Sequence, residues 1–249
     1  MWRHCGVTSH LIYRGTVRPA VPIDKPTIEE LIEHDKAHLC AGDDSDVCVK
    51  VVAIADFPSR LGDFQIVGFY NNHDDKDHIA VVKGDICDEE AVPVRLHSEC
   101  LTGDVLGSKR CDCGEQLEAA LRLIEEEGRG AILYMRQEGR GIGLINKIKA
   151  YQLQDFGLDT VEANVALGFE PDERDYAIAA HMLKSLHVKS VRLITNNPKK
   201  IHGLEAHNVE VVGRIPIIID PNPHNKDYLR TKATKSGHLL DNLFNKNPE

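Results

Sequence analysis

The sequence predicts an α/β fold built on a mixed sheet with flanking helices, and two patterns carry this prediction. Residues 49–97 contain four extended runs separated by polar turns, which is typical of an antiparallel meander. The residues beyond 113 instead alternate helical and strand-like segments, which is typical of parallel strands with helices between them. A chain of 249 residues is also long enough to bury a sizeable core without disulfide bonds.

Composition and charge exclude several classes of protein. With 42% hydrophobic and 28% charged residues, the chain resembles an ordinary globular protein, and it has no apolar run near the roughly 20 residues of a membrane-spanning helix. The net charge of −9 opposes the basic surface that polynucleotide binding requires. We therefore expect neither a membrane nor a polynucleotide as partner. A local basic pocket for a small polyanion is compatible with this balance.

The cysteines and the N-terminal residues bear on localisation. Seven cysteines form an odd set in a chain without the features of a secretory signal, which predicts a reducing, cytoplasmic setting. Residues 1–23 hold three arginines and no acid, so they mildly resemble an organelle-targeting peptide, but serine is scarce there. We therefore treat targeting by this segment as the minor alternative.

The elements of the first half follow in order. Residues 1–23 are expected to be an arm, because prolines interrupt them and no periodicity is present. Thr27 and Glu30 form a capping box before a short helix that reaches about His38. Four extended runs then follow, at residues 49–57, 63–70, 78–84 and 91–97.

The second half shows apolar helical periodicity and short β-branched runs in alternation. In chain order these are a helix closed by Gly128, a strand at 131–136, a helix at 144–154, a helix through Ile178, Met182 and Leu186, strands at 191–195 and 209–213, and an amphipathic segment near 226–244. In such a sheet, ligands gather at the carboxyl ends of the strands.

Cys100, Cys111 and Cys113 form the sharpest cluster, after one predicted strand and just before a helix. Three thiolates suit zinc, with Zn–S distances of roughly 2.3 Å, and leave a fourth position open for water. Zinc lowers the pKa of bound water toward roughly 7, which suits hydrolysis of a C=N unit in a heterocycle. The alternative is a structural site with Cys87 or His97 as fourth ligand, and the spacing favours neither.

A second candidate is the glycine-rich segment 139–143, between a predicted strand and a predicted helix. Glycines let backbone amides approach an anion, and the start of a helix favours negative charge. The spacing matches neither a Walker loop nor a dinucleotide fingerprint, so a tight turn explains it equally well. Charged residues surround the segment: Arg136, Glu138, Arg140, Lys147 and Lys149.

Two further polar segments lie beside predicted elements. Asp172 and Asp175 fit an N-cap and a first-turn acid of the next helix, whereas Arg174 in that first turn would oppose the helix dipole unless a polyphosphate lay nearby. Thr195 and Lys200 follow a strand end, which is a natural place for phosphate or ribose contacts. An exposed Asn-Pro turn explains this second segment as well.

Four segments in chain order closely resemble GTP cyclohydrolase II of riboflavin biosynthesis: 95–121, 135–155, 160–176 and 195–205. The resemblance runs from about residue 50 to HNKDYLRTKATKSGHLL near the C-terminus, so we expect this domain at 49–249. It implies a zinc- and magnesium-dependent enzyme, usually a homodimer, that opens the imidazole ring of GTP. The products would be formate, pyrophosphate and 2,5-diamino-6-ribosylamino-4(3H)-pyrimidinone 5′-phosphate.

The resemblance also implies roles for individual residues. Asp172 becomes the proton acceptor, Arg174 a proposed nucleophile and Tyr151 a catalytic tyrosine. Because a guanidinium stays protonated and is a poor nucleophile, we favour electrostatic stabilisation at the α-phosphate for the arginine. The implied zinc ligands are Cys100, Cys111 and Cys113. The implied GTP contacts are Arg95, Leu96, His97, Ser98, Glu99, Gln116, Glu138, Gly139, Arg140, Thr160, Thr195 and Lys200.

The resemblance leaves the N-terminal residues outside the catalytic domain. Residues 25–34 resemble the junction after the 3,4-dihydroxy-2-butanone 4-phosphate synthase domain of bifunctional enzymes, but the acid-rich catalytic segment of that synthase is absent. Residues 1–48 are therefore expected to be an arm or a remnant. Two other functions compete with the hydrolase, namely a GTP-binding module without turnover and a ring hydrolase that stops at the formamide.

Overall fold

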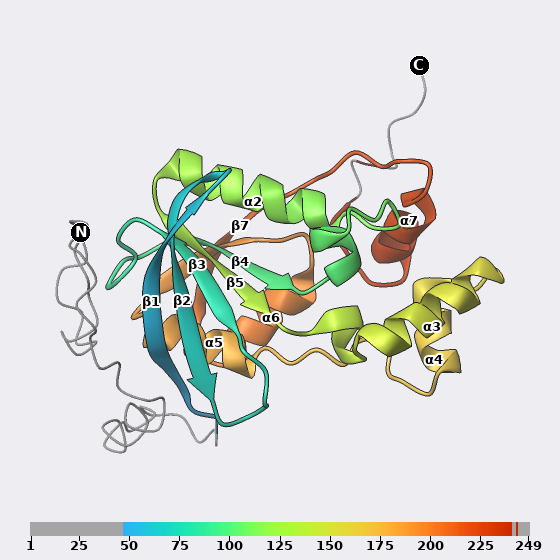
Figure 1. The fold of residues 1–249 in the computed structure, drawn as a ribbon, viewed down its shortest axis with the longest axis horizontal. Helices are drawn as coiled ribbons and strands as arrows, with labels where there is room; N and C mark the ends of the chain where they lie inside the picture. Colours follow the sequence, from blue (N-terminus) through green and yellow to red (C-terminus); the bar gives the residue numbers. More distant parts are fainter. Residues whose placement is uncertain (1–46, 241–242, 244–249) are drawn as a thin grey trace, which may run out of the picture.

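The structure is a computed structural model, and it describes residues 47–240 and residue 243. Within them, seven strands form one sheet in the order β1-β2-β3-β5-β4-β6-β7, with helices on both faces (Figure 1). The predicted fold class, a mixed α/β sheet with antiparallel strands first, is confirmed. The expected arm at 1–23 and the expected helix at 27–38 lie outside the described residues.

The first three strands form the expected antiparallel meander. They are β1 (Val49–Ser59), β2 (Gly62–Asn71) and β3 (Ile79–Lys83). The β2–β3 connection is closed by the Asn71 side chain, whose Oδ1 accepts hydrogen bonds from the backbone N–H groups of His73 and Asp74, at 2.9 and 2.8 Å. Such local bonds favour a turn at this point.

The fourth predicted strand does not join the meander, so that part of the prediction is wrong. β5 (Gly130–Met135) lies between β3 and β4 (Val92–Ser98), antiparallel to β3 and parallel to β4. Six of the seven residues of β4 are buried. Polar Arg95 and His97 are buried together with the apolar residues of the strand, because β4 is paired on both edges and covered on both faces, as is typical of parallel sheets. β6 (Ser190–Ile194) and β7 (Glu210–Ile215) continue the parallel part.

Three helices cover the two faces of the sheet (Figure 1). α2 (Cys113–Glu127) packs Ala120 and Ile124 against the smaller of two apolar clusters. The larger cluster lies on the opposite face, where α5 (Ala177–Ser185) contributes most of its length and α6 (Pro198–Glu205) contributes Leu204. The body is therefore a three-layer α/β/α arrangement.

The remaining helices lie beyond the carboxyl ends of the parallel strands (Figure 1). They are α3 (Leu144–Asp155), α4 (Thr160–Ala166) and α7 (Lys226–Thr234). A π-helical turn at Leu101–Val105 follows β4, and a 3₁₀ turn at Glu138–Gly141 follows β5. These five segments place side chains above one edge of the sheet.

The described fold begins two residues before the predicted boundary at residue 49. Val47 is buried in the larger apolar cluster. The Cys48 N–H donates to Asn72 Oδ1 at 2.6 Å, and the Asn72 N–H donates to the Cys48 carbonyl at 3.2 Å. The domain boundary itself stays a prediction. No described helix combines the length and the apolar composition that crossing a membrane takes.

Candidate active site

A pocket opens at the carboxyl ends of β4, β5 and β6, between the sheet edge and helices α3, α4 and α7. Most residues predicted for the site line it: Arg95, His97, Ser98, Glu99, Cys100, Cys111, Cys113, Gln116, Glu138, Gly139, Arg140, Tyr151, Thr160, Arg174, Thr195 and Lys200. Leu96 and Asp172 do not. The Leu96 side chain lies in the core, and its carbonyl accepts a hydrogen bond from Lys200 Nζ at 2.6 Å.

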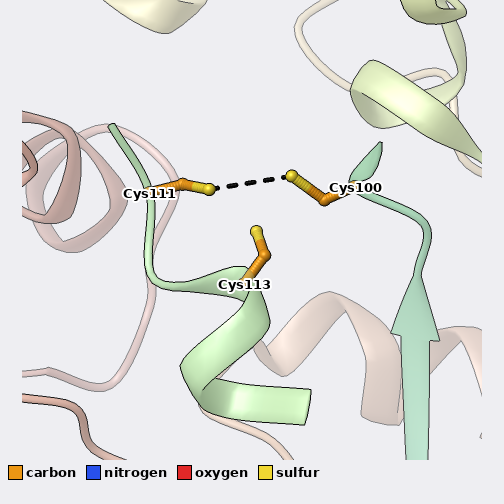
Figure 2. Close-up of side chains that lie close together, drawn as sticks. All are labelled: Cys100, Cys111 and Cys113. Carbon is orange, nitrogen blue, oxygen red and sulfur yellow. Dashed lines mark hydrogen bonds between the residues drawn. The ribbon is translucent and has the colours of Figure 1, made fainter. Parts of the chain in front are cut away.

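Three thiols meet at one wall of this pocket. Cys100 follows β4, Cys111 precedes α2, and Cys113 is the first residue of that helix, and their sulfurs converge (Figure 2). The sulfurs lie within 4.8 Å of one another, and those of Cys100 and Cys111 are 3.6 Å apart. In a tetrahedral site with Zn–S near 2.3 Å, sulfurs are about 3.8 Å apart. The arrangement therefore fits zinc.

A glycine in the π-helical turn lets the backbone approach the thiols. A Cβ placed on Gly103 would lie 2.9 Å from Cys111 Sγ and 3.1 Å from Cys100 Sγ. Neither contact leaves room for a larger residue beside a bound metal. The turn after β4 is thus shaped around the sulfurs.

The two candidates for a fourth ligand do not belong to the thiol cluster. His97 Nε2 lies 3.0 Å from both carboxylate oxygens of Asp104, and its Nδ1 accepts from Arg95 Nε at 3.4 Å. Within the described part of the chain, the ligand group around Cys100 contains three cysteines and excludes Cys87. The geometry therefore favours a site with an open position over a closed structural one.

The thiols also differ in acidity. Hydrogen bonds from Cys111 and Cys113, assisted by the Lys147 ammonium, hold the pKa of Cys100 far below its usual range. The hydrogen bond with Cys100 raises the pKa of Cys111 to about 11. Cys100 is thus the sulfur on which negative charge concentrates before any metal binds.

Asp104 fastens the loop that carries Cys100. Its carboxylate accepts hydrogen bonds from the Cys100 N–H at 3.0 Å, from the Tyr134 hydroxyl at 2.9 Å and from the His97 ring. Burial lowers the pKa of His97. A neutral imidazole that donates from Nε2 and accepts at Nδ1 from Arg95 satisfies both contacts.

The lining of the pocket also collects cations. Arg95 is buried, and desolvation lowers its pKa to about 10. Burial also lowers the pKa of Lys200, and repulsion by Arg174 and Arg95 lowers it further. The positive charge of these residues also acts on His238. Burial and the nearby Lys232, among other cations, lower the pKa of His238 to about 3. A small polyanion would relieve this repulsion.

The glycine-rich segment adopts a strained conformation. Gly139 and Arg140 both have left-handed backbones, with φ of 64° and 63°. Such a conformation costs a non-glycine residue on the order of 1–3 kcal/mol. The Arg140 carbonyl accepts a hydrogen bond from the Glu173 N–H at 3.0 Å, and a Cβ on Gly141 would lie 2.8 Å from Glu173 Cβ. The segment is therefore more than a turn, because it locks against residues 170–175.

Arg174 does not lie in the first turn of a helix, and the sequence interpretation was wrong there. α5 begins at Ala177, and Asp175 Oδ1 accepts from the Ala177 N–H at 2.6 Å. Arg174 lies in the preceding loop, where its Nε and Nη2 each donate to Asp172 at 2.7 Å. Asp175 therefore satisfies the first N–H group of the helix from just before it, and Asp172 orients the guanidinium.

Tyr151 lies on α3 and presents its hydroxyl 3.1 Å from Thr102 Oγ1 in the π-helical turn. The Arg110 guanidinium lies 5.1 Å from the centre of its ring. Burial raises the pKa of the phenol. The hydroxyl is therefore protonated at neutral pH and lies on the same side of the pocket as the thiols.

The comparisons with known proteins agree with this geometry. The family model described as GTP cyclohydrolase II matches residues 50–216. The chain belongs to the GTP cyclohydrolase II family. The resemblance read from the motifs is thereby confirmed.

Relatives of this family member include longer proteins. Two of them, named riboflavin biosynthesis protein RibBA, come from Bacillus cytotoxicus and Bacillus mycoides and are 54% and 55% identical over 215 residues. These matches cover 86% of this chain and 52% of each relative, so the chain spans about half the length of those curated relatives. A solved structure of RibBX, a two-domain 3,4-dihydroxy-2-butanone 4-phosphate synthase from A. baumannii, matches with a TM-score of 0.40 and 17% identity. The match covers 77% of this chain and 44% of that structure's chain.

Sequence reasoning missed Lys232 in the pocket of this GTP cyclohydrolase II family member, and it missed the contact of Lys147 with the thiols. Lys232 lies beyond the matched range, and its Nζ donates to Asp112 Oδ1 at 2.7 Å. Although burial favours the neutral acid, the Lys232 charge lowers the pKa of Asp112. Lys147 lies 3.1 Å from Cys100 Sγ. One sequence signal could have indicated that Lys147 lies at the site: it is four residues from Tyr151 on α3, so the two side chains share a face of the helix.

Proposed function

We propose that the chain opens the imidazole ring of GTP by hydrolysis, releasing formate and pyrophosphate and leaving 2,5-diamino-6-ribosylamino-4(3H)-pyrimidinone 5′-phosphate. One observation carries the proposal: three clustered thiols with an open position and a group of buried cations face the same pocket. The thiol side suits attack on a ring carbon, and the cationic side suits a triphosphate. Family membership supports the same reaction.

Cys100, Cys111 and Cys113 would hold zinc, which supplies an acidic water and a Lewis acid when bound. Magnesium would accompany the triphosphate of the substrate. Arg95, His97 and Gln116 form one hydrogen-bonded row along the pocket floor, with Arg95 Nη2 donating to Gln116 Oε1 at 2.6 Å. This row restricts the position of the bound nucleotide, because each member is already oriented by a neighbour.

Tyr151 is proposed to manage protons at the opening ring. Its phenol is protonated at neutral pH, since burial raises its pKa. It can therefore donate a hydrogen bond or a proton toward the nitrogen that leaves the ring carbon. Thr102 holds the hydroxyl in place.

Arg174 is proposed to stabilise the charge that develops at the α-phosphate as pyrophosphate leaves. Although burial opposes its charge, Asp172 raises the pKa of Arg174 above its ordinary range, so the guanidinium is a cation and not a nucleophile. The same pairing lowers the pKa of Asp172 against the effect of burial. Asp172 is thus ionised and is our proposed proton acceptor.

The further GTP contacts are proposed for Ser98, Glu99, Gly139, Arg140, Thr160, Thr195 and Lys200, which line the pocket, and for the backbone of Leu96. Glu138 is 7% exposed, and three internal donors occupy its carboxylate, so its proposed part is to shape the loop that the nucleotide meets. We also propose a cytoplasmic homodimer, on the resemblance to the family.

The decisive experiment is the mass of the product after incubation of the full chain with GTP, Zn²⁺ and Mg²⁺. A product that has lost both formate and pyrophosphate is expected. A chain that binds GTP without turnover would be a binding module, and a product that retains the formyl group would identify a hydrolase that stops at the formamide. Either outcome would contradict the proposal.

A further inference from the structure

A buried lysine lies against the thiol cluster, and the reaction proposed above gives it no role. Lys147 comes from α3, and its side chain is 11% exposed. Its Nζ lies 3.1 Å from Cys100 Sγ and 2.8 Å from Glu138 Oε1. The ammonium therefore bridges a sulfur of the cluster and a buried carboxylate.

Glu138 fixes the direction of this ammonium. Besides the lysine, its carboxylate accepts hydrogen bonds from the Leu101 N–H at 2.7 Å and from the Gly139 N–H at 2.8 Å. The lysine Nζ also lies 5.6 Å from the centre of the Tyr151 ring. Three groups thus contact Nζ, namely a sulfur, a carboxylate and an aromatic ring, so it has little freedom to point elsewhere.

The charge of a three-thiolate site explains why a cation belongs there. A zinc ion with three thiolates carries one net negative charge, and a buried charge without a hydrogen-bond donor is costly. Among the described residues, Lys147 is the cation that hydrogen-bonds to a sulfur of this cluster. Groups that support a ligand from outside the coordination shell typically change metal affinity by about 10–100-fold.

We propose that Lys147 is a positioning residue of the metal centre: held by Glu138, it donates a hydrogen bond to the Cys100 thiolate and strengthens zinc binding. The proposal rests on the zinc site proposed above but not on turnover of GTP. The Glu138 carboxylate accepts from the N–H groups of Leu101, which follows Cys100, and of Gly139. It therefore supports both the metal centre and the glycine-rich segment.

The test measures zinc affinity directly, by competition with a chromophoric chelator. Lys147→Met keeps the length of the side chain and the helix propensity, and we expect its zinc Kd to rise about 10–100-fold. Lys147→Arg keeps the charge and should recover most of that loss. Lys149→Met is the matched control, because Lys149 is exposed on the same helix and its Nζ donates to Asn146 Oδ1 at 3.3 Å. Its zinc Kd should equal that of the wild type.

A second measurement separates the hydrogen bond from the packing of the lysine. In the cobalt-substituted protein, loss of the N–H donor should shift the sulfur-to-metal charge-transfer band of Lys147→Met to lower energy. Lys147→Met also leaves the Glu138 carboxylate without its cation. The double variant Glu138→Gln with Lys147→Met replaces that carboxylate by a neutral amide, so its zinc binding should be as weak as that of Lys147→Met if the lost N–H donor is the cause.

Three outcomes would overturn the proposal. A zinc Kd for Lys147→Met within twofold of the wild type would show that the hydrogen bond does not matter. A Kd for Lys147→Arg as weak as that of Lys147→Met, with unchanged circular dichroism, would assign the lysine to packing. A wild-type chain that binds no zinc would overturn this proposal and the proposed function together, whereas the first two outcomes leave GTP hydrolysis by the wild type intact.

Discussion

The antiparallel and the parallel halves of the sheet differ in what they contribute to the pocket. Among the described residues, the antiparallel strands β1, β2 and β3 contribute nothing to the pocket, whereas β4, β5 and β6 all end at it. Parallel strands bring their carboxyl ends to one edge, so the loops that follow them meet there. Antiparallel strands send successive turns to opposite edges. Strand direction, more than composition, decides where the chemistry gathers.

The halves differ in what they bury as well. β4 buries Arg95 and His97, and the polar atoms of both side chains form hydrogen bonds at the pocket. The antiparallel half buries apolar residues together with two polar ones, Asn71 and His78, and both hold the β2–β3 turn: His78 lies 3.2 Å from Asp74, and Asn71 accepts from backbone N–H groups of the turn. The first half is therefore expected to govern stability, and the second to govern the reaction.

The largest expected effect is at the thiol cluster. Cys111→Ser should remove zinc and ring opening together, with a loss of metal affinity beyond the 10–100-fold that a supporting residue causes. Elemental analysis of the purified variant checks this. Cys48→Ser, at the start of the antiparallel half, should keep its zinc. Full zinc in Cys111→Ser would rule out the ligand assignment.

The next effect concerns the cations of the pocket. Arg174→Ala should slow pyrophosphate release by about 10²–10³-fold and change GTP affinity less, because its proposed role appears only as the charge develops. GTP dissociation and single-turnover pyrophosphate formation are measured separately. Arg192→Ala is the matched control, since that arginine pairs with Glu127 outside the pocket. A large loss of affinity at an unchanged single-turnover rate would make Arg174 a docking residue.

Shortening the N-terminus should separate stability from activity. A chain that begins at Val47 should open GTP with a kcat/KM near that of the full chain, because the catalytic residues we propose all lie beyond residue 90. A chain that begins at Val49 loses the buried valine, which is worth about 1.5–3 kcal/mol, and its hydrogen-bonded neighbour. Urea unfolding and kcat/KM of both chains test this. An inactive but folded, zinc-loaded chain from Val47 would show that the arm completes the site.

The smallest effect is a pH dependence in the antiparallel half. Burial lowers the pKa of His78 from its usual 6.5, in spite of Asp74. The unfolded chain then takes up the proton first, so this stability is complete above about pH 6.5 and declines as the pH falls below it. His78→Gln should flatten part of the decline in unfolding free energy between about pH 7 and about pH 5. An unchanged slope, or a changed kcat/KM at pH 7, would contradict the division between the halves.

Much of the fold could be predicted because its signals are local. Alternation and turns located β1, β2 and β3, and the cysteine spacing placed three ligands around one helix start. The place of β4 could not be predicted, because partners from distant parts of the chain determine it. α4 and α6 were missed although Asp159 and Asn197 cap them, since helices of 7 and 8 residues show little periodicity.

The site was less accessible to sequence reasoning where its contacts are long-range. Lys147 reaches Cys100 across 47 residues, and Lys232 reaches Asp112 across 120. A lysine on a helix surface has no pattern that distinguishes it from a solvated one. Arg174 was misplaced for a related reason, because the helix start three residues later depends on the Asp175 side chain.

The position of β4 also has a consequence for synthesis on the ribosome. The meander can pair as soon as β3 emerges, but β4 waits for both of its neighbours, and its pairing of Val92 with Val191 closes a loop of roughly 100 residues. At translation rates of about 5–20 residues per second, this strand is unpaired on that side for about 5–20 seconds. The strand that carries Arg95 and His97 to the pocket is therefore open to chaperones, and to aggregation, during that interval of synthesis.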